Sequence, residues 1–174
     1  MRCVLALGPV ALLAAGCGAE DPVAKTLAQS SEHVELSGIV TAGRKTQRFH
    51  ASGDFRNHPD EGSLRLHVGS STVHAVITES RVYLSSPSFR LPKGKQWLSV
   101  SAANAPAGTQ TPARVLRAIG SGAHYRTTTA NGLVRHIEIS DPQVTMAIDF
   151  SRFGEPIRVH IPASAMTVRQ GGSK

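Results

Sequence analysis

The feature that most constrains the fold of this chain is an alternation of apolar and polar side chains that begins near Val34 and returns in run after run. A period of two residues places successive side chains on opposite faces of a β-strand. The runs are short, and turn-forming segments such as residues 57–62 and 151–156 separate them. Short strands joined in this way form antiparallel sheets with one apolar and one polar face. The alternation predicts strands at residues 34–40, 48–55, 64–68, 73–77, 81–84, 96–101, 136–139, 144–150 and 157–161.

Two segments have the features of helices instead. Asp21 followed by proline is typical of an N-cap and the first helical position, which predicts a helix over residues 22–32. A second helix is expected over residues 112–119, because Thr-Pro precedes it and Gly120 ends it. Its apolar face consists of Val115, Leu116 and Ile119.

Together these elements predict one domain over residues 22–169, followed by a flexible tail at residues 170–174. An antiparallel sheet must cover its apolar face, and two short helices cover only part of it. The expected fold class is therefore α+β, mainly antiparallel β: a single curled sheet (an open half-barrel) with one to two helices on the concave face. Parity within the strands predicts that one set of residues shares this face: Val34, Leu36, Phe49, Leu64, Leu66, Val73, Ile137, Met146, Ile148 and Ile157.

The beginning of the chain has the features of a lipoprotein export signal. Arg2 provides a positive start, an apolar run covers residues 4–13, and small residues lie directly before Cys17. The run is shorter than the roughly 20 residues that span a bilayer. We therefore expect a signal peptide at residues 1–16 and a diacylated Cys17 that opens a short tether over residues 17–21. The alternative is an ordinary secretory signal followed by a chance cysteine.

This signal predicts an extracytoplasmic protein that is lipid-anchored to the outer face of the cell membrane. Once Cys3 is removed and Cys17 is acylated, no thiol remains for a disulfide. Loss of Arg2 leaves 18 Lys and Arg against 12 acidic residues, a net charge of +6. Outside the membrane the available polyanions are lipid headgroups and acidic wall polymers, and no nucleic acid is expected. A solvated basic surface without a partner is the alternative.

The polar residues of the chain do not form a recognisable catalytic or metal motif. No Gly-x-Ser-x-Gly turn, phosphate loop or dinucleotide fingerprint occurs, and the carboxylates are scattered. We expect no enzyme activity, no cofactor and no metal. Five histidines lie opposite the apolar set of their own strand and are expected on the exposed face: His50, His67, His74, His136 and His160.

Large aromatic side chains, including Trp97, are expected mainly in the core. Phe89 is the exception, because it lies in a loop rich in Pro, Gly and Lys. Two placements for it remain open. In the first the ring is free, and it inserts into the membrane interface or gates a cavity mouth. In the second it is pinned under its own loop.

Three segments resemble the LppX/LprG type of actinobacterial lipoprotein, which shares the fold of the lipoprotein carriers LolA and LolB. They are the lipobox followed at once by a helix, the run of residues 82–84 leading to 95–100 with Trp97, and the ending at residues 149–157. The chain departs from the family between Gly120 and Asp141, where it is shorter and is expected to lack a strand pair. The resemblance implies a half-barrel that binds acyl chains and has no catalytic residues.

The functional expectation is a membrane-anchored carrier or chaperone for lipids or lipoconjugates. Phe89 would gate its cavity, and the expected lining is Val34, Leu36, Phe49, Leu64, Leu66, Val73, Leu116, Ile119, Ile137, Met146 and Ile148. The rival is a non-enzymatic envelope lipoprotein whose core is filled by its own side chains. Such a protein would dock a protein partner, or a wall polymer, through its polar face.

Overall fold

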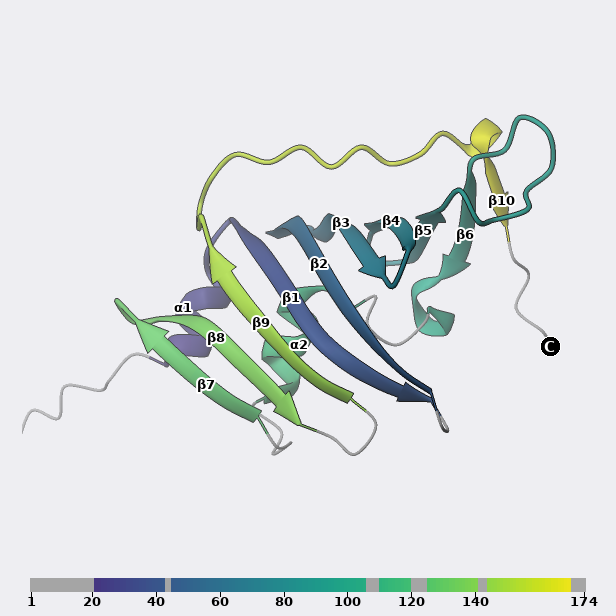
Figure 1. Ribbon diagram of the computed structural model, residues 1–174. Coiled ribbons are helices and arrows are strands. Elements are labelled where there is room, and N and C mark those ends of the chain that lie inside the picture. The colour runs from purple at the N-terminus through teal and green to yellow at the C-terminus, as the bar shows by residue number, and fades with distance from the viewer. Residues whose placement is uncertain (1–20, 43–44, 106–109, 120–124, 141–143, 170–174) are drawn as a thin grey trace, which may run out of the picture.

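The computed structural model describes residues 21–42, 45–105, 110–119, 125–140 and 144–169, which form one open sheet and two α-helices (Figure 1). The helices are α1 (Pro22–Leu27) and α2 (Pro112–Ile119). The strands are β1 (Ser31–Ala42), β2 (Lys45–Asn57), β3 (Asp60–Val68), β4 (Ser71–Ile77), β5 (Arg81–Ser85), β6 (Trp97–Ser101), β7 (Tyr125–Ala130), β8 (Leu133–Ser140), β9 (Val144–Ser151) and β10 (Thr167–Arg169).

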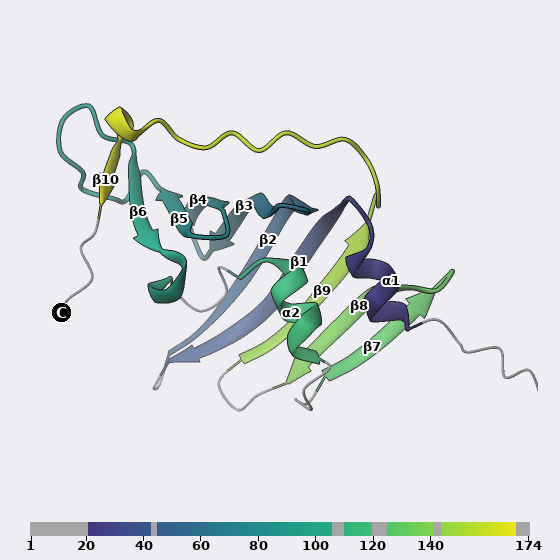
Figure 2. The same cartoon turned by 180° about the vertical axis from the view of Figure 1, so that it is seen from behind.

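The strand order is β10-β6-β5-β4-β3-β2-β1-β9-β8-β7, and every neighbouring pair is antiparallel except β10 and β6. Both helices lie on one side of this sheet (Figure 2). The expected fold class, a single curled antiparallel sheet with helices on its concave face, is confirmed. Single 3-10 turns lie at Ala102–Asn104 and Ser164–Met166.

The register places the expected apolar residues on one face. Val34 lies opposite Gly53 of β2 and Phe150 of β9, and the same row continues through Leu64 and Ala75. Residues directly opposite one another in a sheet project to the same side. By this criterion the prediction is confirmed for nine of the ten residues, Ile157 being the exception: Val34, Leu36, Phe49, Leu64, Leu66, Val73, Ile137, Met146 and Ile148.

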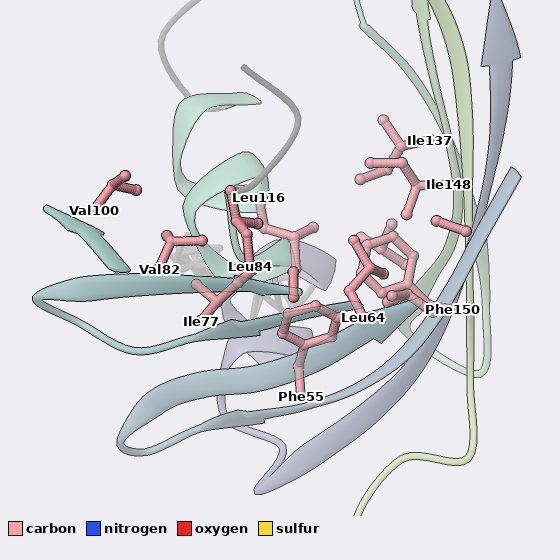
Figure 3. Close-up of a cluster of buried hydrophobic side chains, with 14 residues drawn as sticks. Phe55, Leu64, Ile77, Val82, Leu84, Val100, Leu116, Ile137, Ile148 and Phe150 are labelled. Carbon is pink, nitrogen blue, oxygen red and sulfur yellow. The ribbon is translucent and has the colours of Figure 1, made fainter. Parts of the chain in front are cut away.

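Two glycines inside strands receive aromatic rings from the neighbouring strand. Phe55 packs over Gly62, and a Cβ at Gly62 would collide with its ring. Phe49 lies in the same way over Gly38, where a Cβ would be 2.7 Å from Cζ of the ring. The absent side chains thus let two large rings lie flat against the sheet. Figure 3 shows Phe55 in the buried cluster that Leu116 of α2 completes.

The first helix begins as predicted but ends earlier. The Asp21 carboxylate accepts a hydrogen bond from the Val23 amide at 3.0 Å, which confirms the N-cap. The helix ends at Leu27 rather than near Glu32, because the residues that follow pair with β2. The Asn57 amide, for example, donates to the Ser30 carbonyl at 3.2 Å. Glu32 consequently lies in β1, opposite Phe55.

The strand expected at residues 157–161 is absent from the described structure. Both edges of β1 are already paired, with β2 and with β9, and β8 occupies the other side of β9. The chain therefore has no free neighbour to pair with at this point. Instead it runs as an irregular segment over residues 152–163 past the ends of the central strands, as Figures 1 and 2 both show. It joins the sheet only at the far edge, where β10 pairs with β6.

The expected loss of a strand pair between residues 120 and 141 is wrong. This interval contains the hairpin β7–β8, whose turn is Asn131–Gly132 with positive φ at both residues. Such a turn matches the twist of a two-residue hairpin. β7 is an edge strand with five exposed residues, so it carries no apolar alternation that would have predicted it.

Candidate functional site

A cavity of about 180 Å³ lies between α2 and the concave face of the sheet. Its walls come from α2, from the segment just before it and from strands β1, β2, β3, β7, β8 and β9. The lining is apolar apart from Gln110 and the hydroxyl of Tyr125: Leu36, Phe55, Leu64, Pro112, Val115, Ala118, Ile139, Met146 and Ile148 complete it.

The structure brings only part of the expected lining to this cavity. Leu36, Leu64, Met146 and Ile148 are among its walls. Val34, Leu116 and Ile137 are fully buried in the adjoining core and fill space instead of lining it. Phe49, Leu66 and Val73 project from the same sheet face but are not part of the cavity walls, and the side chain of Ile119 lies outside the described residues.

Phe89 does not line this cavity. It lies in the loop between β5 and β6 and packs, partly buried, against the hydrophobic core. The cavity, by contrast, has walls from strands on the other side of β4. Of the two placements that the sequence left open, this contact with the core favours the second, in which Phe89 is held in place and does not insert into the membrane. A gating role for this side chain stays a prediction without geometric support.

A buried polar cluster lies at one end of the concave face, where α1, β1 and β2 meet. The Glu32 carboxyl is 1% exposed, and Asn57 Nδ2 donates to its Oε2 at 2.9 Å. The same Asn57 nitrogen donates to the Gln29 carbonyl at 3.1 Å. Burial raises the pKa of Glu32 to about 7; the Asn57 hydrogen bond lowers it, and the nearby Asp60 carboxylate raises it further. Glu32 is therefore substantially protonated at neutral pH.

Asp60 connects this cluster to α2. Its Oδ2 lies 3.5 Å from Arg114 Nε and 3.4 Å from Arg117 Nη1. Arg114 also donates to the Glu79 carbonyl at 3.0 Å. Three polar atoms of the cluster have no hydrogen-bond partner in the described part of the protein: Glu32 Oε1, Asn57 Oδ1 and Asp60 Oδ1. Through Asp60 the cluster connects α2 to β3.

Sequence reasoning missed this cluster because it placed Glu32 at a helix end and residues 57–62 in a turn. The signal was available in the parity of β1. Glu32 is separated by even steps from Val34 and Leu36, so a strand reaching back to Ser31 places it among apolar residues.

The outer face of the sheet is polar, and the histidines lie there as expected. His50 is directly opposite His67, and His74 is opposite Arg65. His136 Nδ1 is 2.6 Å from Asp149 Oδ1, an interaction that raises the pKa of His136. His160 lies exposed in the irregular segment and not in a strand. Among the described residues, no group of three or more His, Asp or Glu is placed to hold a metal ion.

Trp97 was expected in the core, but it lies on the outer face of the sheet. It shares its parity with Ser99, which lies opposite Tyr83 on the outer face. There Trp97 lines an open groove of about 280 Å³ that extends over β1 to β6. The groove residues whose side chains have outer-face parity are His33, Ser52, Asp54, Ser63, Arg65, His74, Val76 and Trp97.

No family model matches this chain, and no curated protein matches it either. Residues 1–20, which carry the expected signal peptide and Cys17, lie outside the described residues. In the part of the chain that the structure describes, neither helix is long and apolar enough to cross a membrane.

Proposed function

We propose that this protein is a lipid-anchored carrier that holds lipid acyl chains against the concave face of its sheet. The observation that carries the proposal is the apolar cavity between α2 and the strands. A methylene group transferred from water into such surroundings gains about 0.8 kcal/mol, so an acyl chain binds without any catalytic group. The lipoprotein features of residues 1–17 support a location at the membrane, where such ligands are found.

The size of the cavity defines how binding must occur. A volume of about 180 Å³ is smaller than the roughly 300–1,000 Å³ of typical ligand pockets. A long acyl chain therefore requires α2 to move away from the sheet. This helix has only eight residues, and besides the sheet that it covers it packs against α1. Such a short cover can move as a unit while the sheet stays intact.

The proposed anchor is the acylated Cys17. Only the residues up to Asp21 separate it from α1, and a tether of this length reaches about 17 Å when fully extended. The domain would remain close to the bilayer surface. Acyl chains could then transfer between membrane and cavity without long excursions of the domain through water.

Native mass spectrometry tests both parts of the proposal. The Cys17→Ala chain is expected to lose its acyl anchor, to leave the membrane fraction and to be purified without detergent. Copurifying lipid on this protein would support the carrier function. Recovery of an unacylated wild-type chain would contradict the anchor, whereas a ligand-free protein after incubation with lipid vesicles would contradict the carrier.

A matched pair of variants then places the lipid. Val115→Trp fills the cavity from α2, and we expect a folded protein with at least tenfold less bound lipid. Ile161→Trp adds the same ring at a side chain that is 54% exposed and is not part of the cavity walls, so lipid binding should be unchanged. Equal lipid content in both variants would place the ligand elsewhere.

The small cavity also favours one specific rival, a lipoprotein whose core is essentially filled and which docks a partner. The same pair of variants separates the two. If Val115→Trp unfolds the domain while Ile161→Trp does not, the space behind α2 cannot be enlarged. The rival function would then explain the structure better.

A further inference from the structure

The groove on the outer face differs from the rest of this polar surface because it combines an aromatic side chain with an apolar floor. Val76 projects to the outer face and yet is only 6% exposed, since it lies between Ser63 of β3 and Tyr83 of β5. Trp97 is the first residue of β6 and is half-buried at that end of the groove. A flat ring beside an apolar floor offers the C–H face of a sugar a surface on which to stack.

Arg65 supplies a cation to the same groove. It is exposed, and its guanidinium forms no ion pair or hydrogen bond with any residue that the structure describes. The register places it between Ser52 of β2 and His74 of β4. A guanidinium presents a planar fork of donors that matches a carboxylate or a phosphate. Arg65 therefore remains free to bind an anionic group of a ligand.

On the opposite side of the groove the Asp54 carboxylate is already paired with His33 and Arg152. That side therefore offers hydrogen bonds and no unpaired charge. His33 Nδ1 is 2.7 Å from Asp54 Oδ1, and Arg152 Nη2 is 3.4 Å from the same oxygen. Ser52 and Ser63 lie beside Asp54 with hydroxyl groups that donate and accept. Such donors and acceptors bind sugar hydroxyls, and among the groove residues that the structure describes only Arg65 is an arginine or lysine.

We propose that this groove binds a sugar that carries an anionic group, carboxylate or phosphate, with the ring stacked on Trp97 and the anion on Arg65. The volume of about 280 Å³ suits one or two sugar units, and the open form of the groove suits a polymer that passes across it. The groove lies on the outer face and the cavity on the concave face of the same sheet, and Leu64 of β3 contributes to both. The protein would thus hold an acyl chain on one face and an acidic glycan on the other.

Trp97 is the only tryptophan of the chain, so its fluorescence reports on the groove directly. We would titrate the full chain in mild detergent with trigalacturonate, glucose 1-phosphate, maltotriose and inorganic phosphate, and confirm binding by calorimetry. We expect a saturable fluorescence change with trigalacturonate, with glucose 1-phosphate or with both. The first ligand represents carboxylate-bearing and the second phosphate-bearing sugars, so the two responses identify which anion the groove prefers.

Two arginine variants make the test specific. Arg65→Gln should weaken binding about tenfold, because it removes a charge-assisted contact. Arg48→Gln removes the same charge from an exposed residue of β2, on the same face but outside the groove, and should leave binding unchanged. Neither exposed residue contributes to the core, so both variants are expected to fold.

Three results would overturn the proposal. The first is the absence of a saturable response to either acidic sugar at millimolar concentration. The second is an equal loss of affinity in Arg65→Gln and Arg48→Gln, which would show general charge attraction. The third is binding of maltotriose or of inorganic phosphate as tight as that of the acidic sugars, which would show that ring and anion are not recognised together.

Discussion

The two faces of the sheet are built from the same strands, but one is apolar and covered by the helices, and the other is polar and exposed. The concave face packs large side chains such as Phe55 and Ile148 against α2, and a small apolar cavity remains there. The outer face carries serines, histidines and arginines and has an open groove beside Trp97. The contrast shows that stability depends on one side of each strand, while the other side is free to bind. Changes at neighbouring positions of one strand should therefore have very different effects.

The largest expected effect comes from truncation of the concave face. Phe55 is 2% exposed and covers Gly62, so Phe55→Ala leaves both a cavity and an uncovered backbone. We expect a loss of about 3–5 kcal/mol in the free energy of unfolding. His50→Ala, on the outer face of the same strand, should cost less than about 0.5 kcal/mol. Urea denaturation with matched m-values measures both, and similar losses would contradict the division between the faces.

A second large effect follows from Glu32, which is buried beside apolar residues at this end of the concave face. Its pKa is about 7 in the folded protein, against 4.5 without burial. The folded state therefore holds a proton that the unfolded state releases, and stability falls as the pH rises from 4.5 to 7. The expected loss is about 3 kcal/mol between pH 4 and pH 8.

Denaturation at several pH values tests this dependence. Glu32→Gln mimics the protonated carboxyl and should remove most of the slope. Glu35→Gln is the matched control, because Glu35 lies on the outer face of the same strand and is exposed. The interpretation is wrong if the slope survives in Glu32→Gln or disappears equally in Glu35→Gln.

The comparison of the faces also explains which features the sequence could predict. A period of two residues assigns the face of every residue in a well-paired strand, so the concave set follows from parity alone. The same parity in β6 places Trp97 with Ser99 and Ser101, not with Leu98 and Val100. The alternation within β6 therefore predicts the face of Trp97 correctly, whereas the general tendency of large aromatic residues to be buried does not.

Other features could not be predicted because no local pattern encodes them. β7 is an exposed edge strand, and β10 has three residues that pair only because the outer edge of β6 is free. Residues 157–161 do alternate, yet they form no strand, since β1 and β9 already have two neighbours each. The volume of the cavity behind α2 depends on how side chains from six strands and a helix pack, which periodicity does not determine.

The smallest expected effect concerns a titratable pair on the outer face. The hydrogen bond that the protonated His136 ring donates to Asp149 raises the pKa of His136 above 6.5, with a further contribution from Glu138, whose Oε1 is 3.7 Å from Nε2. The pair stabilises the protein below pH 6.5 and loses its effect as the pH rises through the raised pKa. Because both side chains are substantially exposed, water screens the interaction to less than about 0.5 kcal/mol.

This last effect is best observed through the pKa itself. In an NMR titration, Asp149→Asn should lower the pKa of His136 toward 6.5 while the signals of His74, which has no ion pair with any described residue, stay unchanged. Unfolding free energies should barely respond, in contrast to the response expected at Glu32. A change in stability as large as that of the Glu32 variant would mean that the outer face also supports the fold. An unshifted His136 would mean that Asp149 does not bind it in solution.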